Sequence, residues 1–316
     1  MKDLYKREIS YLRISITDAC NLRCLYCVGD EPCSNNSLPA DEMSPEEIIH
    51  VARAAVSLGI KKIRVTGGEP LIRPDVVQIC EGLGKIEGLE ELTMTTNGLL
   101  LEKYAKQLKK AGVSRVNISL DTMDSNKFCM VTGREELKTV RKGIEAAKEA
   151  GLLPIKINVV LLAGINDDEI EKFAALTLMD HIEVRFIELM PIGAANYNDF
   201  SFLSGDVVVE KVPELIPVED SGVAKLYQLP NGKGKVGIIR PVSRHFCPSC
   251  NRIRLTSDGK LKPCLHSDEE IKIRHLSGDE LIETIKSAIA HKPMEHGDFL
   301  EGEQSDSKRG MNRIGG

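Results

Sequence analysis

The stretch that decides the fold reads Leu12-Arg-Ile-Ser-Ile-Thr-Asp-Ala-Cys20-Asn-Leu-Arg-Cys24-Leu-Tyr-Cys27. Apolar and polar residues alternate over Leu12–Thr17, which predicts a strand with one apolar and one polar face. The spacing C-x3-C-x2-C follows directly and places three thiols in a loop at the carboxyl end of that strand. Parallel α/β barrels carry their chemistry at this end of the sheet. The stretch therefore predicts a first strand that leads straight into a ligand site.

Five further strand patterns follow along the chain, and helical patterns separate them. The strand patterns lie at Lys62–Thr66, Glu91–Thr96, Arg115–Leu120, Ile155–Leu161 and Ile182–Leu189. The helical patterns lie at Pro45–Leu58, Asp75–Leu83, Leu101–Ala111, Glu135–Ala150 and Asp168–Thr177. Ser44 before Pro45, with Glu47 three residues further on, predicts a capping box for the first helix. This alternation predicts an α/β fold with a parallel sheet, either a partial barrel or an open doubly wound sheet.

One face of the predicted strands is polar in strand after strand, and it carries Arg13, Arg64 and Lys156. Both faces would be mostly apolar in a closed eight-stranded barrel or in a sheet covered on both sides. We therefore expect a curved sheet, a partial (βα)6 TIM-like barrel, with helices outside and a roomy polar interior for a ligand. The alternative is an antiparallel sheet with one solvated face, which the intervening helices disfavour.

Length and composition limit the classes of protein to which this chain can belong. The 316 residues suggest two domains, and 42% hydrophobic with 28% charged residues are enough for globular cores. The net charge of −5 argues against broad nucleic-acid binding. No apolar run approaches the roughly 18 residues that cross a bilayer, and the first residues lack the apolar core of a signal peptide. We expect a cytoplasmic protein with no nucleic-acid or membrane partner.

The pattern changes after Phe200, so we expect a partial-barrel domain at residues 1–200 and a smaller C-terminal domain at 201–316. The smaller domain is predicted to contain two hairpins, Leu226–Arg240 and Asn251–Cys264, the second turning at Asp258-Gly259. A helix is predicted at Ser277–Ala290, and the charged stretch Glu301–Arg309 is expected to be mobile.

Six of the nine cysteines lie in two triplets, a distribution that suggests metal binding rather than disulfide bonds. The first triplet is Cys20, Cys24 and Cys27. Structural zinc normally takes four ligands, whereas a [4Fe–4S] cluster can take three cysteines and leave one iron open to a small molecule. Zinc with a distant fourth ligand such as Cys33 is the alternative.

The second triplet has the spacing C-x2-C-x13-C and comprises Cys247, Cys250 and Cys264. A zinc site completed by His245 or His266 is a serious alternative to an iron–sulfur cluster here. Between the cysteines, Arg252 and Arg254 share one face of a predicted strand. Two guanidiniums beside a metal centre predict an anion site, because their planar forks match phosphate oxygens. A solvated basic face is the plainer explanation of the arginine pair.

The first triplet, with Tyr26 just before its last cysteine, resembles the signature of the radical S-adenosylmethionine (SAM) enzymes. The resemblance implies a [4Fe–4S] cluster whose open iron binds the methionine end of SAM, and one electron that splits SAM to give a 5′-deoxyadenosyl radical. The loop Thr66-Gly67-Gly68-Glu69-Pro70 resembles the glycine loop that this family holds against SAM, although a tight turn would also explain its glycines. By position, the resemblance assigns SAM contacts to Tyr26, Gly68, Ser119 and Met190.

The second triplet, the run Cys250-Asn-Arg-Ile-Arg-Leu-Thr256 and the pair Gly315-Gly316 are similar to those of the GTP 3′,8-cyclases of molybdenum-cofactor biosynthesis. This resemblance covers essentially the whole chain. It implies a second, auxiliary [4Fe–4S] cluster in the C-terminal domain that holds the guanine of GTP. The radical then takes hydrogen from ribose C3′, and the carbon radical attacks C8 of guanine. The resemblance assigns GTP contacts to Arg13, Arg64, Thr95, Lys156, Arg252 and Arg254.

In that family the double-glycine end reaches into the active site, which implies a catalytic role for Gly315 and Gly316, with Arg313 near the phosphates or the radical. A disordered glycine tail is the alternative. The expected partners are GTP, a low-potential electron donor and the next enzyme of the pathway, cyclic pyranopterin monophosphate synthase. We expect a monomer or a homodimer.

Two other functions stay open at this point. A peptide-modifying radical SAM maturase would also use an auxiliary cluster, but such enzymes usually carry more C-terminal cysteines and lack the arginine pair with the glycine tail. A non-catalytic zinc protein would bind zinc at both triplets, and these sites would only stabilise the fold. Val28-Gly29 and Pro248 depart from residues common in the cyclases, and Cys33 is an additional thiol.

Overall fold

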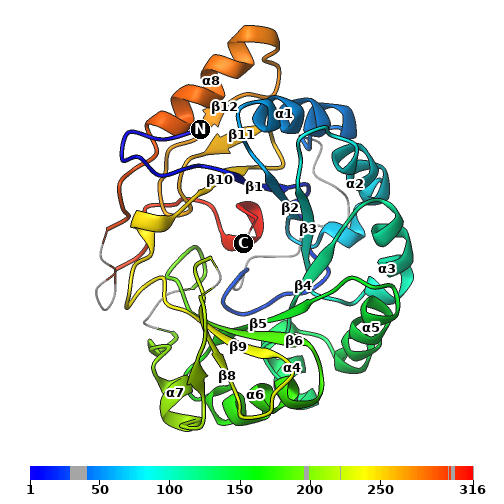
Figure 1. Cartoon of the computed structure of the whole chain (residues 1–316), viewed down its shortest axis with the longest axis vertical. Coiled ribbons are helices and arrows are strands. Elements are labelled where there is room, and N and C mark those ends of the chain that lie inside the picture. Colours follow the sequence, from blue (N-terminus) through cyan, green and yellow to red (C-terminus); the bar gives the residue numbers. More distant parts are fainter. Residues whose placement is uncertain (29–40, 196–198, 221, 298, 300–302, 316) are drawn as a thin grey trace.

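Six parallel strands form the centre of one curved sheet in the computed structural model, which describes residues 1–28, 41–195, 199–220, 222–297, 299 and 303–315 (Figure 1). Each of them pairs in parallel with the next. All six predicted strands are confirmed, three with the predicted ends and three with ends that differ by one or two residues. They are Tyr11–Ser15 (β1), Lys62–Thr66 (β2), Glu91–Thr96 (β3), Arg115–Ser119 (β4), Ile155–Leu161 (β5) and Ile182–Glu188 (β6).

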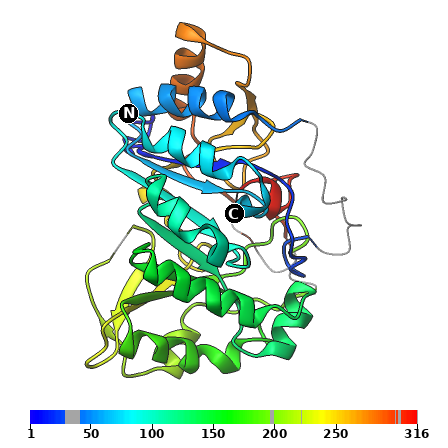
Figure 2. The same cartoon turned by 90° about the vertical axis from the view of Figure 1, so that its right-hand side faces the viewer.

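The helices between these strands lie along the outer side of the sheet, as Figure 2 shows. The predicted capping box is confirmed, because Ser44 N–H donates to Glu47 Oε2 at 2.7 Å and Glu47 N–H donates to Ser44 Oγ at 3.2 Å. The sequence pattern misses α4, an eight-residue helix whose start is set by Asp124, which accepts from the N–H groups of Asn126 and Lys127. The helices are Pro45–Ser57 (α1), Val76–Gly84 (α2), Leu101–Lys110 (α3), Ser125–Thr132 (α4), Leu137–Glu149 (α5) and Ile170–Met179 (α6), with 3-10 turns at Pro70–Ile72 (η1) and Asp167–Glu169 (η2).

C-terminal strands extend this sheet at both of its edges. They are Ile216–Pro217 (β7), Lys225–Gln228 (β8), Lys235–Ile239 (β9), Arg252–Leu255 (β10), Lys260–Lys262 (β11) and Ile271–Lys272 (β12). Strand β10 pairs in parallel with β1, and β9 pairs in parallel with β6. The order across the sheet is β12-β11-β10-β1-β2-β3-β4-β5-β6-β9-β8-β7, so β1 and β6 do not meet and the barrel is partial, as predicted.

Both predicted hairpins are confirmed. The β8–β9 turn contains Asn231 with φ of 62°, and the β10–β11 turn contains Gly259 with φ of 78°, in the left-handed region that suits these residues. Strands from either side of residue 200 share one sheet. The division into domains at 1–200 and 201–316 therefore stays a prediction.

The apolar core lies between the sheet and the outer helices. Leu12 and Ile14 of β1, with Ile63 and Val65 of β2, are fully buried there. The opposite face of the same strands carries polar side chains and encloses cavities. The predicted polar interior is confirmed.

The remaining elements are Val207–Lys211 (α7), Cys247–Ser249 (η3), Gly278–Ala290 (α8) and Met311–Arg313 (η4). Figure 1 shows the last described segment, in red, inside the curve of the sheet. In the described part of the stretch predicted to be mobile, Ser307 and Arg309 are buried, and Arg309 forms ion pairs with Asp258 and Glu270. Among the described helices, none is long and apolar enough to cross a membrane.

Candidate functional site

The first triplet opens into a cavity of about 200 Å³ at the carboxyl end of the sheet, here called the first cavity. Side chains from the ends of β2 to β6 line it together with the cysteine loop. The structure thus brings together the first triplet and every residue with a predicted SAM contact. These residues are Cys20, Cys24, Tyr26, Cys27, Gly68, Ser119 and Met190.

The glycine loop packs directly against the cysteine loop. Gly68 N–H donates to Thr17 O at 2.7 Å, and Glu69 N–H donates to Ala19 O at 2.8 Å. A Cβ atom on Gly68 would lie 2.2 Å from Ala19 O, so no larger residue fits without moving the backbone. Close packing therefore explains this glycine, and the same contact holds both loops on one wall of the cavity.

Burial favours the protonated forms of the thiols and acids around the first cavity. Burial, assisted by Glu69, raises the pKa of Cys20 to about 11, and burial raises the pKa of Cys27 to about 12. Burial also raises the pKa of Glu69 to about 7, although its carboxylate accepts hydrogen bonds from Asn97 N–H and Leu71 N–H. No described lysine, arginine or histidine lines this cavity. Because no described basic side chain is present to stabilise ionised cysteines here, the positive charge that stabilises the thiolates would have to come from bound iron.

Tyr26 is fixed by a hydrogen bond across the cavity. Its hydroxyl donates to Asp121 Oδ2 at 2.7 Å, and Asp121 Oδ1 accepts from Val160 N–H at 2.8 Å. Burial raises the pKa of Asp121 to about 6. Thr95 also lines this cavity, and its hydroxyl is buried without a hydrogen-bond partner among the described residues. The structure therefore groups Thr95, a predicted GTP contact, with the predicted SAM contacts.

The second triplet, Cys247, Cys250 and Cys264, faces a larger cavity of about 310 Å³, here called the second cavity. Nine lysine and arginine side chains line it, and no described Asp or Glu does. In a chain of net charge −5, this concentration of positive charge suits a polyphosphate. The cations are Arg13, Lys62, Arg64, Arg115, Lys156, Arg185, Arg252, Arg254 and Lys292.

Strand register explains why these cations converge. Arg254 of β10, Arg13 of β1 and Arg64 of β2 are direct neighbours across adjacent strands, and all three are buried. Five of the six predicted GTP contacts lie in this cavity, namely Arg13, Arg64, Lys156, Arg252 and Arg254. The prediction misses Lys62, Arg115, Arg185 and Lys292. Alternation along the strands is the signal that would find Lys62 and Arg115, whereas no pattern points to Lys292 beyond α8.

The cations of the second cavity change the protonation of their neighbours. Burial, together with nearby arginines, lowers the pKa of Lys62 and of Lys156 to about 8. Lys156 keeps one counter-ion, since its Nζ lies 2.6 Å from Glu183 Oε2. Although burial opposes the shift, Arg252 and Lys292 lower the pKa of Cys250 to about 7. This thiol ionises far more readily than the thiols of the first cavity.

The tail lies between the two cavities. Met311 lines both, and Asn312 lines the first. Gly315 O accepts a hydrogen bond from Arg254 Nη1 at 2.5 Å. The structure thus places the described tail inside the barrel, where the family resemblance implies it. Gly316 lies outside the described residues.

Arg313 is held outside both cavities. Its Nε lies 3.2 Å from Asp18 Oδ2, and 55% of its side chain is exposed. This placement differs from the prediction of a role near the phosphates or the radical. The physical reason is the ion pair with Asp18, which draws the guanidinium toward the surface.

Each triplet supplies a donor set that fits an iron–sulfur cluster, because soft thiolates favour such clusters and three of them border each cavity. Within the described ranges, no three His, Cys, Asp or Glu side chains could hold a single metal ion. The thiolates of a four-iron cluster bind different iron atoms, so they lie farther apart than the ligands of one ion. Of the alternative zinc ligands, Cys33 lies outside the described residues, and His266 Nδ1 lies 3.0 Å from Ser305 Oγ.

Comparison with known proteins identifies the class. The family model of the radical SAM superfamily matches residues 14–177, and the model of Molybdenum Cofactor Synthesis C matches residues 182–298. Among solved structures, Streptococcus suis SuiB bound to S-adenosylmethionine has a similar fold, with a TM-score of 0.64 and 16% identity over 89% of this chain and 68% of that chain. The fold and the first triplet therefore define a member of the radical SAM superfamily.

Curated relatives narrow the class further. The GTP 3′,8-cyclase of Alkaliphilus oremlandii is 48% identical over 323 residues, which covers 100% of both chains. The GTP 3′,8-cyclase of Peptoclostridium acidaminophilum is 50% identical over 99% of this chain and 98% of its own. That of Thermodesulfovibrio yellowstonii is 47% identical over 100% of both. The chain belongs to the GTP 3′,8-cyclase family.

Proposed function

We propose that this protein converts GTP into 3′,8-cyclo-7,8-dihydro-GTP, the first step of molybdenum-cofactor biosynthesis. The observation that carries the proposal is the second cavity, in which nine cations and no described carboxylate surround a cysteine triplet. A triphosphate carries about four negative charges, and hydrogen bonds to charged groups contribute roughly 1.5–3 kcal/mol each. Several converging cations are needed to offset its loss of hydration.

The two cavities would divide the reaction between them. In the first, the triplet would hold a [4Fe–4S] cluster, and Tyr26, Gly68, Ser119 and Met190 would hold SAM beside it. In the second, the triplet would hold a further [4Fe–4S] cluster against the guanine, while the arginines and lysines bind the triphosphate. The cluster held by the first triplet would supply the electron that cleaves SAM and gives the 5′-deoxyadenosyl radical.

The junction of the cavities fits the transfer of a hydrogen atom. Asn158, Ile187, Met190 and Met311 line both cavities. A ribose placed at this junction would present C3′ to the first cavity, and guanine C8 would lie beside the same ribose. Enclosure by these side chains would exclude water from the radical.

The remaining partners belong to this proposal as well. A low-potential electron donor would supply two electrons per turnover: one reduces the first cluster for SAM cleavage, and one, with a proton, converts the cyclised radical into the dihydro product. Cyclic pyranopterin monophosphate synthase would take this product. Thiol-ligated clusters suit the reducing cytoplasm, where free cysteines stay reduced.

Anaerobic reconstitution with iron and sulfide, followed by incubation with GTP, SAM and dithionite, tests the proposal. We expect about eight iron atoms per chain, corresponding to two clusters. We also expect 5′-deoxyadenosine that forms only with GTP, and an isomer of GTP with the same mass but a different retention time. ATP is the matched control and should give neither compound. Protein without iron, or 5′-deoxyadenosine formed independently of GTP, would overturn the proposal.

A further inference from the structure

Arg309 anchors the tail to the β10–β11 region through two carboxylates. Its Nη2 lies 2.7 Å from Asp258 Oδ2 and 3.0 Å from Glu270 Oε2, and its Nε also pairs with Glu270 Oε1. The Arg309 side chain is only 10% exposed. Two parallel hydrogen bonds to Glu270 fix the guanidinium plane as well as its position. This cluster of Arg309, Asp258 and Glu270 is called the tail clamp below.

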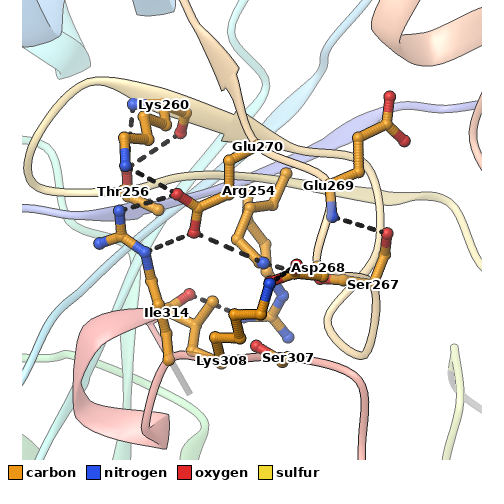
Figure 3. Close-up of polar contacts among 12 residues, drawn as sticks. Arg254, Thr256, Lys260, Ser267, Asp268, Glu269, Glu270, Ser307, Lys308 and Ile314 are labelled. Atoms are coloured by element: carbon orange, nitrogen blue, oxygen red, sulfur yellow. Dashed lines mark hydrogen bonds and ion pairs between the residues drawn. The ribbon is translucent and has the colours of Figure 1, made fainter.

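The carboxylates of the tail clamp are themselves held in place. Asp258 Oδ1 accepts a hydrogen bond from Thr256 Oγ1 at 2.6 Å, and Glu270 Oε2 lies 2.8 Å from Lys260 Nζ. Figure 3 shows Lys260 and Glu270 joined above the tail. The hairpin that supports the clamp also carries Arg252 and Arg254 into the second cavity. The clamp therefore sets the tail relative to the predicted triphosphate contacts.

Beyond the tail clamp, residues 310–315 fill the space between the cavities closely. A Cβ atom on Gly193 would lie 2.7 Å from Gly310 Cα, and one on Gly315 would lie 2.8 Å from Thr66 Cγ2. Ile314 is fully buried. The backbone of Asn312 makes a hydrogen bond to Cys27 of the first triplet. At the other side, Arg254 Nη1 donates to Gly315 O, so this short segment contacts both sites.

We propose that Arg309 is a positioning residue that holds residues 310–315 as the wall between the two cavities. Arg309 lines neither cavity, so it acts through Met311 and Gly315. The inference rests on the proposed function, because it concerns how a radical made in one cavity meets a substrate bound in the other. Small displacements of a reacting geometry cost up to about a hundredfold in rate. A displaced wall leaves SAM cleavage intact and separates it from cyclisation.

The neighbouring Lys308 provides a matched control. Its Nζ lies 2.6 Å from Asp268 Oδ2, but 82% of its side chain is exposed (Figure 3). Exposed ion pairs of this kind contribute little to stability. Removal of either basic side chain changes the net charge equally, but only the loss of Arg309 removes ion pairs from two partly buried carboxylates, which then keep Lys260 as a shared partner.

Hydrogen–deuterium exchange of the reconstituted protein without substrates gives a first readout. In Arg309→Ala we expect exchange of residues 310–315 to accelerate about tenfold or more, because local opening exposes their amides. The second readout is the ratio of 5′-deoxyadenosine to cyclised product. In Arg309→Ala this ratio should rise about tenfold while kcat for cyclisation falls, and the KM for SAM should change less than about twofold. Lys308→Ala should match the unaltered protein in both measurements.

Equal exchange and equal product ratios in Arg309→Ala and Lys308→Ala would overturn the inference. Asp258→Asn removes one carboxylate and leaves the Glu270 contact, so it should shift both readouts in the same direction by less. This variant decides the question if Arg309→Ala does not fold. Failure of the unaltered protein to cyclise GTP would instead contradict the proposed function, while the exchange measurement would still test the clamp.

Discussion

The two cavities are each lined by three cysteines, the same set of proposed ligands, in opposite electrostatic surroundings. No described cation lines the first cavity, whereas nine line the second. The pKa of Cys20 is raised to about 11 by burial and by Glu69, whereas Arg252 and Lys292 lower the pKa of Cys250 to about 7 against the effect of burial. A positively charged sulfonium ligand would be repelled by arginines, and a triphosphate would require them. The surroundings, more than the cysteines, therefore separate the two proposed binding roles.

Single strands contribute to both cavities. Arg64 of β2 and Lys156 of β5 line the second cavity, while Thr66 and Val160 of the same strands line the first. Two residues along a strand advance about 6.6 Å. The two sites are thus stacked along the barrel. Over the two residues from Arg64 to Thr66, and the four from Lys156 to Val160, the described lining changes from one with nine cations to one with none.

The largest expected effect separates the two triplets. Cys24→Ala should abolish SAM cleavage, a loss of more than about a thousandfold, because the first cluster loses a ligand. Cys250→Ala should lose cyclisation together with the SAM cleavage that depends on GTP, but it should keep the first cluster and its affinity for SAM, which isothermal titration measures. Liquid chromatography of 5′-deoxyadenosine and of the product, with iron analysis, measures both. Cys129→Ala is the control outside both cavities. An equal loss of SAM affinity in both triplet variants would contradict the division of roles.

The next effect concerns the buried cations. Arg64→Ala should weaken GTP binding about 10- to 150-fold, the equivalent of one charged hydrogen-bonding group at roughly 1.5–3 kcal/mol. SAM affinity should not change. Isothermal titration of the reconstituted protein with each ligand measures the two affinities, and Arg53→Ala, which alters an exposed arginine of α1, is the control. A matching loss of SAM affinity would show that the cavities are not independent.

A smaller effect follows from the lowered pKa of Lys156, about 8, which burial and Arg185 cause. Bound triphosphate favours the protonated lysine, so GTP affinity should be nearly constant near pH 7 and fall as the pH rises through about 8, by at most tenfold per pH unit for one group. Lys62, with a pKa also near 8, adds to the decline. Titration calorimetry between pH 7 and about 9.5 measures it. Lys156→Arg should flatten the profile, and an equally steep profile in that variant would refute this origin.

The smallest effect lies in the first cavity. Tyr26→Phe removes the 2.7 Å hydrogen bond to Asp121 and should lower the free energy of unfolding by about 1 kcal/mol. GTP affinity should stay unchanged, because Tyr26 does not line the second cavity. Anaerobic denaturant unfolding measures the stability, with Tyr5→Phe at a half-exposed position as the control. A change in GTP affinity without a change in stability would argue against this assignment.

Local periodicity explains why so much of the interior could be predicted. Arg13, Arg64 and Lys156 belong to regular strands, so alternation alone fixes the face on which they lie. The same rule places Lys62 and Arg115, which the site prediction omits. In contrast, Lys292 and Arg309 follow no strand or helix period. Their positions depend on how distant segments dock, and sequence spacing carries no information about that docking.

The strand pairing at the two edges of the sheet could not be predicted from the sequence. Both C-terminal hairpins are recognisable from their turns, but their parallel pairing with β1 and β6 has no local signal. The orientation of the Arg313 side chain could not be predicted either, because it also depends on a residue distant in sequence. Its neighbours in sequence point into the barrel, and only the nearby Asp18 explains why its guanidinium turns outward.

The pairing of β10 with β1 affects how the chain folds during translation. Tyr11 is the register partner of Arg252, so β1 leaves the ribosome long before the strand that will flank it. At 5–20 residues per second, the delay is roughly 10–50 s. During this time one border of the nascent barrel presents unpaired amide and carbonyl groups that other chains can capture. Until translation reaches the β10–β11 hairpin, this border is therefore a place where the nascent chain can pair incorrectly.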